Sequence, residues 1–153
     1  MLSHIFPEFD YSFNVVVGEH DTTDSKDGTI HTVMKIDEHP SYSSSPPKFD
    51  FAIVTLTKPV SFNTRANAAC LPTTEWDDDF FAGKDLKVSG WGVTSESGGT
   101  PTVLHQVTVP GITNFECNTL YPRRITDQML CAGNVEDGGV DSCQGDSGGI
   151  TIE

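Results

Sequence analysis

Short apolar runs recur along the chain, and turn-forming residues bound each of them. The runs are 3 to 7 residues long and are dominated by valine, isoleucine, threonine and phenylalanine, which are residue types enriched in β-strands. Glycine, proline, aspartate and serine fill the intervals, as is typical of short strands joined by loops. We therefore predict strands near residues 13–17, 30–36, 51–56, 86–88 and 103–109.

One segment departs from this pattern. Residues 114–121 favour a short helix, because Thr113 or Asn114 offers a side-chain oxygen that can cap its first turn. Two loops rich in serine, proline and glycine, residues 41–47 and 95–101, do not separate segments of different composition. The expected fold class is all-β, a barrel or a sandwich rather than a helical fold.

The length and charge of the chain exclude several classes of function. Its 153 residues suffice for one domain with a core. Lys and Arg total 9 against 22 Asp and Glu, a formal net charge of -13, which would repel phosphate backbones and anionic lipid surfaces. We therefore expect neither nucleic acid nor a membrane as a partner. The acidity is interpreted as a solvated surface, with a weak attraction for basic substrates as the alternative.

Targeting segments and metal sites are not visible in the sequence. No stretch approaches the roughly 20 apolar residues that cross a bilayer, and the first residues lack the features of a secretory signal. The cysteines are too widely spaced for a zinc site of the Cys-x-x-Cys kind, which leaves disulfides or buried thiols. We expect no metal and no cofactor. The four cysteines are Cys70, Cys117, Cys131 and Cys143.

The clearest chemistry lies in the run DSCQGDSGG at residues 141–149. It places Ser147 among glycines and directly after Asp146. Glycines permit tight turns and the close approach of a substrate carbonyl, and the N–H groups of Gly145 and Ser147 can point at a developing oxyanion. Ser147 is therefore a candidate nucleophile, and an ordinary turn serine is the alternative.

This run resembles the active-site loop of trypsin-like serine proteases, and the resemblance covers approximately residues 15–149. It implies two antiparallel six-stranded β-barrels with the active site between them, residues 1–70 being the remnant of the first barrel and residues 71–153 that of the second. Six further segments resemble motifs of the family in the family's order: VVVGEHD at 15–21, HPSY at 39–42, DFAIVTL at 50–56, CLP at 70–72, GWG at 90–92 and MLCAG at 129–133.

The resemblance implies a triad of Ser147, Asp50 and His4. Asp50 would accept the second N–H of the histidine ring and stabilise the imidazolium, whereas the alternative is an aspartate that caps a strand. His4 lies 46 residues before Asp50, near the family's spacing, although Ile5 stands where the family has a cysteine. The alternative is an ordinary histidine at a frayed terminus. The remaining histidines are interpreted as surface or packing residues: His20, His31, His39 and His105.

Further roles follow from the same resemblance. Gly145 and Ser147 would form the oxyanion hole. Asp141 lies six residues before Ser147, where the family keeps the acid of its specificity pocket, and this implies cleavage after Lys or Arg. A solvated loop aspartate is the alternative. Asp146 would pair with a new N-terminal ammonium in an activated member.

The resemblance also bears on cross-links and metals. Cys117 and Cys131, 14 residues apart, match a disulfide of the family and are expected to be bonded in an oxidising compartment. The acidic loop that begins at Glu19 binds calcium in some relatives, but its ligand spacing here does not fit a calcium site. No metal is assigned.

The implied activity is hydrolysis of peptide bonds after Lys or Arg. The partners would be protein or peptide substrates and protein protease inhibitors, and the location would be extracellular by resemblance alone. Because the family's fold continues before His4 and after Gly149, we expect the chain to be an incomplete form. Two alternatives are a non-catalytic homologue that binds proteins through the same cleft and a misassembled gene product with no independent role.

Overall fold

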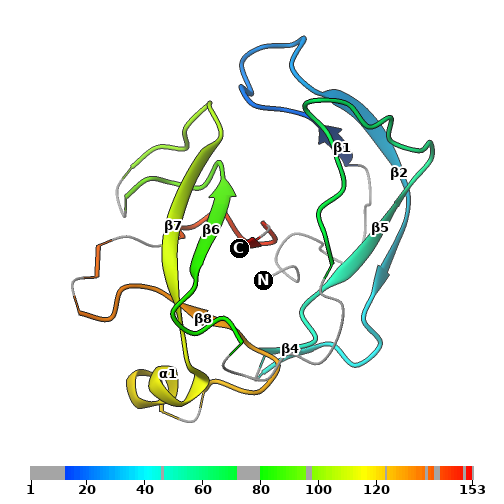
Figure 1. Ribbon diagram of the computed structural model, residues 1–153. Coiled ribbons are helices and arrows are strands. Elements are labelled where there is room, and N and C mark those ends of the chain that lie inside the picture. Colours follow the sequence, from blue (N-terminus) through cyan, green and yellow to red (C-terminus); the bar gives the residue numbers. More distant parts are fainter. Residues whose placement is uncertain are drawn as a thin grey trace. The chain divides into compact units, whose positions relative to one another are not determined.

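The computed structural model describes residues 13–45, 47–71, 80–95, 98–122, 124–136, 138–139, 142–149 and the backbone of 151–152. Their regular secondary structure consists of short strands and one short helix, α1 (Figure 1), which confirms the all-β prediction. The sheets are antiparallel, whereas their closure into two barrels stays a prediction. The elements are β1 (Asn14–Val17), β2 (Thr29–Glu38), β3 (Ser43–Ser44), β4 (Pro47–Lys48), β5 (Ala52–Leu56), β6 (Asp85–Gly90), β7 (His105–Ile112), α1 (Asn114–Leu120), β8 (Cys131–Ala132) and β9 (Thr151–Ile152).

The chain divides into two compact units. Unit 1 comprises Met1–Pro72 and Thr102–Leu104, and unit 2 comprises Thr73–Pro101 and His105–Glu153. Residues Thr102–Leu104 belong to unit 1 because their backbone pairs with that unit. Val103 forms an isolated antiparallel bridge with Asp21, and the N–H of Leu104 donates to the carbonyl oxygen of His20 at 2.8 Å.

Unit 1 contains a three-stranded antiparallel sheet in the order β1-β2-β5. On one face, half-buried apolar residues of β2 and β5 oppose each other, as in the pairs Val33↔Leu56 and Ile36↔Val54. This is the alternation expected of a strand that buries one face. A register shift between Val33 and Lys35 interrupts the ladder, so that β2 carries one extra residue at this point.

An acidic side chain anchors the loop between β1 and β2. Asp27 is buried, and its Oδ2 accepts the backbone N–H groups of His20 at 2.9 Å and Asp21 at 2.7 Å. Arg65 forms an ion pair with its Oδ1. The N–H of Asp21, aided by that of His20 and by the Arg65 charge, lowers the pKa of Asp27 below its ordinary value of 3.8. This residue therefore differs from the solvated surface predicted for the acidic loops.

Unit 2 contains a four-stranded antiparallel sheet in the order β8-β7-β6-β9. Strands β6 and β7 form its centre, from the pair Asp85↔Pro110 to the pair Gly90↔His105. Leu86 and Val109 are direct cross-strand partners, and they are only 1% and 2% exposed. This pair therefore lies at the centre of the core of unit 2.

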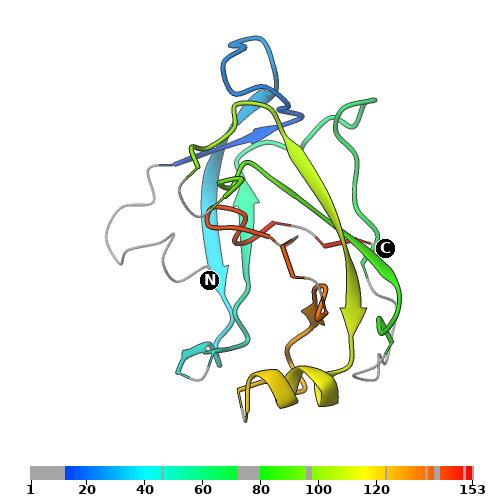
Figure 2. The ribbon, with the colours of Figure 1, turned by 90° about the vertical axis from the view of Figure 1, so that its left-hand side faces the viewer.

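Helix α1 lies where a short helix was predicted, at residues 114–121, and it follows β7 directly. Its cap is Thr113, whose Oγ1 accepts the N–H of Glu116 at 2.9 Å. The Cys117–Cys131 disulfide joins the helix to β8, and both cysteines are buried. Figure 2 shows the helix beside β8 at one end of β7. The side-chain amide of Asn114 donates to two carbonyl oxygens of the loop between α1 and β8, those of Thr126 and Met129, so the second half of this loop is also held to the helix.

Candidate active site

Tight turns in residues 142–149 expose Ser147. The N–H of Asp146 donates to the carbonyl oxygen of Cys143 at 3.0 Å, and the N–H of Gly149 donates to that of Asp146 at 2.9 Å. Gly145 and Gly148 have φ angles of +103° and +84°, which side-chain-bearing residues rarely adopt. The glycines of the GDSGG run therefore permit the turn that places the serine hydroxyl at the surface.

The carboxylate of Asp146 fastens this loop from the inside. Its Oδ1 accepts the N–H of Gly92 at 2.8 Å, and its Oδ2 accepts the N–H of Cys143 at 3.0 Å. Hydrogen bonds to an ionised acceptor are stronger than neutral ones. A further bond runs from the N–H of Val93 to the carbonyl oxygen of Gln144 at 2.9 Å. The loop that carries Ser147 is thus held against the segment that follows β6.

The glycines of the GWG segment make room for this carboxylate. A Cβ atom at Gly92 would lie 2.5 Å from the carboxylate carbon and Oδ1 of Asp146, and one at Gly90 would overlap the same group. A Cβ atom at Gly145 would lie 3.1 Å from the Cα of Gly92. Any side chain at these positions would therefore push the two segments apart. The sequence alone gave this glycine pair no role, although the two glycines directly flank Trp91, which was the available signal.

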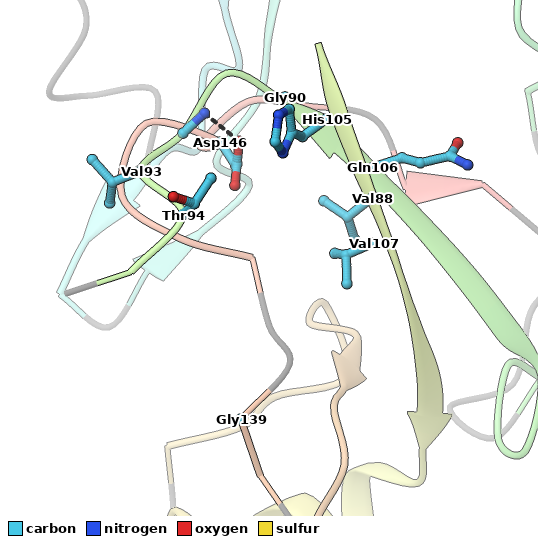
Figure 3. Close-up of a pocket in the computed structure, with 10 residues that line it drawn as sticks. Val88, Gly90, Val93, Thr94, His105, Gln106, Val107, Gly139 and Asp146 are labelled. Atoms are coloured by element: carbon cyan, nitrogen blue, oxygen red, sulfur yellow. Dashed lines mark hydrogen bonds between the residues drawn. The ribbon is translucent and has the colours of Figure 1, made fainter. Parts of the chain in front are cut away.

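A pocket of about 220 Å³ lies beside Asp146 in unit 2 (Figure 3). Val88 and Val107 provide an apolar wall, and Asp146 provides a carboxylate on another side. His105, at the start of β7, also lines the pocket, although the sequence pattern favoured an ordinary surface or packing residue at this position. A carboxylate in a pocket of this composition suits a small cationic group.

Asp50 lies in unit 1 at a sharp turn before β5. Its side chain is half-buried. The N–H of Phe51 donates to the carbonyl oxygen of Phe49 at 2.8 Å, so a three-residue turn has Asp50 at its apex. Phe49 has a φ of +52°, the sole non-glycine residue with positive φ among those described. The left-handed conformation costs about 1–2 kcal/mol for a residue with a side chain.

The structure places the predicted site residues in three groups. Gly145, Asp146 and Ser147 share one loop of unit 2, whereas Asp50 belongs to unit 1. His4 and Asp141 lie outside the described residues. The Cys117–Cys131 disulfide that the resemblance implies is present at α1, and Cys70 and Cys143 have free thiols.

The described ranges contain neither a metal-binding cluster nor a membrane-spanning helix. Within them, no group of three or more His, Cys, Asp or Glu side chains is arranged to hold a metal ion. No helix of the described part has the length and apolar character that would let it span a membrane.

Comparison with known proteins points to a single family. The sequence model of the family described as Trypsin matches residues 3–152. Trypsin of Xenopus laevis is 38% identical over 144 residues, which are 92% of this chain and 57% of that protein. Clotting factor G beta subunit of Tachypleus tridentatus is 38% identical over 149 residues, 91% of this chain and 47% of that protein.

A third relative is much longer. Serine proteinase stubble of Drosophila melanogaster is 40% identical over 141 residues, which are 87% of this chain and 17% of that protein. The chain therefore spans about half the length of the two shorter relatives, and a smaller part of this one.

Proposed function

Because this chain belongs to the trypsin family of serine proteases, we propose that it provides the nucleophile of a serine endopeptidase, Ser147. The observation that carries this proposal is the exposed position of Ser147, on a turn that Gly145 and Gly148 permit and that Asp146 fastens to Gly92. A serine in an ordinary turn has no need of a carboxylate behind it that is held by two backbone N–H groups.

The oxyanion hole would be formed by the N–H groups of Gly145 and Ser147. Within the described part of the chain, neither N–H donates to a protein acceptor, so both can bind the oxygen that becomes negative during acyl transfer. Removing one such donor typically lowers the rate about 100- to 1,000-fold.

The reaction would proceed through an acyl-enzyme. The Oγ of Ser147 would bond to the substrate carbonyl carbon while its proton passes to the base, for which we propose His4. The carbon–nitrogen bond would then break as the base returns the proton to the leaving amine, and water would release the acyl group by the same two steps. Asp50 would hold the base in the correct tautomer and orientation.

Specificity for Lys or Arg would depend on Asp141, through a charge-assisted hydrogen bond with the substrate side chain. The formal net charge of -13 would favour the approach of basic substrates. The carboxylate of Asp146 would pair with an N-terminal ammonium in the adjoining pocket. We propose protein substrates and protein protease inhibitors as partners, and an extracellular location.

A fluorophosphonate probe tests the proposal, because it labels activated serines covalently. The wild-type chain is expected to be labelled, whereas Ser147→Ala is expected to lose the label. Ser61→Ala, which alters an exposed serine of unit 1, should be labelled at the wild-type rate. A folded wild-type chain that takes no label would contradict the proposal and favour a non-catalytic homologue that binds proteins.

A further inference from the structure

We infer that His39 is a positioning residue for Asp50, and that it acts by packing its ring against the aromatic residues on either side of that aspartate. The inference rests on the proposed role of Asp50 as the triad carboxylate. His39 does not itself contact the reacting atoms in this scheme. It would fix the direction from which Asp50 meets the base.

The backbone brings His39 and Asp50 to the same place. After His39, the chain turns through the hairpin of β3 and β4 and returns at Phe49. The N–H of His39 donates to the carbonyl oxygen of Phe51 at 3.2 Å. The aspartate at the apex of the turn is thus enclosed by residues that His39 contacts.

The ring of His39 contacts both neighbours of Asp50. It stacks on the ring of Phe49, with 4.5 Å between centroids and an interplanar angle of 13°. It also meets the ring of Phe51 at 4.9 Å and 53°. Aromatic contacts of these geometries are favourable beyond the area that they bury. Both residues that flank the aspartate are therefore held by one imidazole.

The imidazole is itself fixed in orientation. Its Nδ1 accepts the N–H of Ser41 at 3.1 Å, and the carbonyl oxygen of His39 accepts the N–H of Tyr42 at 2.9 Å. Together with the bond from its own N–H, these contacts anchor the backbone and the ring of His39. The two backbone bonds hold residue 39 where its ring meets Phe49 and Phe51.

The backbone of Phe49 has a conformation that needs support from its neighbours. Its φ of +52° is unfavourable for a residue with a side chain, and such a conformation persists only where the surroundings hold it. The stacked ring of His39 is a contact that helps to hold it here. Without this ring, Phe49 is expected to relax to negative φ, which would turn the peptide that leads into Asp50 and reorient its carboxylate.

Two substitutions separate the effect of the His39 ring from the effect of its hydrogen bond with Ser41. His39→Phe retains a flat aromatic ring but cannot accept the N–H of Ser41, whereas His39→Asn retains a side-chain acceptor but has no ring. If the ring positions Asp50, only His39→Asn should impair the site. His39→Leu, which is apolar and not aromatic, replaces His39→Asn if the latter does not fold.

The first measurement is the rate at which a fluorophosphonate labels Ser147 at several probe concentrations. His39→Asn is expected to lower the limiting rate about 10- to 100-fold, the scale of a small misplacement of a catalytic group, with little change in the half-saturating probe concentration. His39→Phe should remain close to the wild type. Adding Phe49→Gly to His39→Asn should restore part of the rate, because glycine adopts positive φ without strain.

The second measurement does not depend on activity. The ¹³C shift of the Asp50 carboxyl and the hydrogen-exchange rate of the Phe51 amide are recorded for the same variants at a temperature where all are folded. His39→Asn should change both values and His39→Phe should leave both near wild type. If the wild-type chain takes no label, the proposed function fails, and these spectra alone decide the positioning role. The inference is overturned if His39→Asn leaves the Asp50 and Phe51 signals unchanged, or if both variants alter them equally.

Discussion

The carboxylate of Asp146 accepts the backbone N–H of Gly92 at 2.8 Å, across 54 positions of sequence. This bond connects the loop of the exposed Ser147 to the segment that follows β6. It forms only because Gly90 and Gly92 have no side chains to occupy the same space. The serine loop is therefore positioned by residues that lie far from it in the sequence.

Gly92→Ala is expected to destabilise unit 2 by about 1–3 kcal/mol, the usual cost of an overpacked site. The added Cβ atom would lie 2.5 Å from the Asp146 carboxylate, so the loop of Ser147 must shift. Thermal unfolding and fluorophosphonate labelling measure the two effects. Gly99→Ala is the matched control, since a Cβ atom added there would meet open space, with no other group within 4 Å. Equal stability of the two variants would contradict the packing argument.

The stability of unit 1 is expected to fall as the pH drops below about 4, near the ordinary aspartate pKa. The pKa of Asp27 is lowered chiefly by the N–H of Asp21. The unfolded chain therefore binds a proton at higher pH than the folded chain does, and the stabilisation by Asp27 is present above its unfolded pKa and lost as the pH falls through its folded pKa. Unfolding curves from pH 2 to pH 7 measure this dependence.

The matched variants for this pH dependence are Asp27→Asn and Asp85→Asn. Asp27→Asn should be less stable at neutral pH and should lose part of the acid dependence, because it has no proton to gain. Asp85 is exposed on β6, and its variant should follow the wild-type curve. The explanation is wrong if Asp27→Asn retains the full acid dependence.

Removing the disulfide is expected to cost about 3 kcal/mol, the value for a closed loop of roughly 15 residues. The double variant Cys117→Ser and Cys131→Ser tests this through its free energy of unfolding in urea. Cys70→Ser should have no effect, because Cys70 is an exposed free thiol. A wild-type chain that is equally stable with and without a reducing agent would contradict this prediction.

Leu86→Ala is expected to destabilise unit 2 by about 2–5 kcal/mol, because it leaves a cavity beside Val109 in the core. Leu86→Met, which nearly conserves the volume, should cost less than about 1.5 kcal/mol. Leu71→Ala serves as the exposed control, since Leu71 is 83% exposed. Chemical denaturation of the three variants gives the comparison, and a Leu86→Ala value close to that of Leu71→Ala would exclude Leu86 as a core residue.

The strands and the helix that the sequence predicted are those that residues within or directly beside the element already favour. Five apolar runs correspond to β1, β2, β5, β6 and β7, because β-branched residues between turn formers already favour strands. The helix after Thr113 was predictable from its capping side chain. The two-residue strands β3, β4, β8 and β9 were not predicted, since such short elements are defined by their partners rather than by their own composition.

In the candidate site too, the features with a local cause were predictable and the contacts between distant segments were not. The turn around Ser147 was predictable, because its glycines act on their own backbone. The contact of Asp146 with Gly92 and the stacking of His39 on Phe49 were not, because they depend on which segments the fold brings together. The burial of Asp27 was missed for the same reason, since composition alone does not separate an anchored carboxylate from a solvated one.

The return of Thr102–Leu104 to unit 1 has a consequence for synthesis on the ribosome. The carbonyl oxygen of His20 and the N–H of Thr22 pair with this segment, which is translated after about thirty residues of unit 2. The first half of the chain therefore cannot finish folding as it emerges from the exit tunnel. Those pairings form only after the part of unit 2 that precedes Thr102 has been synthesised.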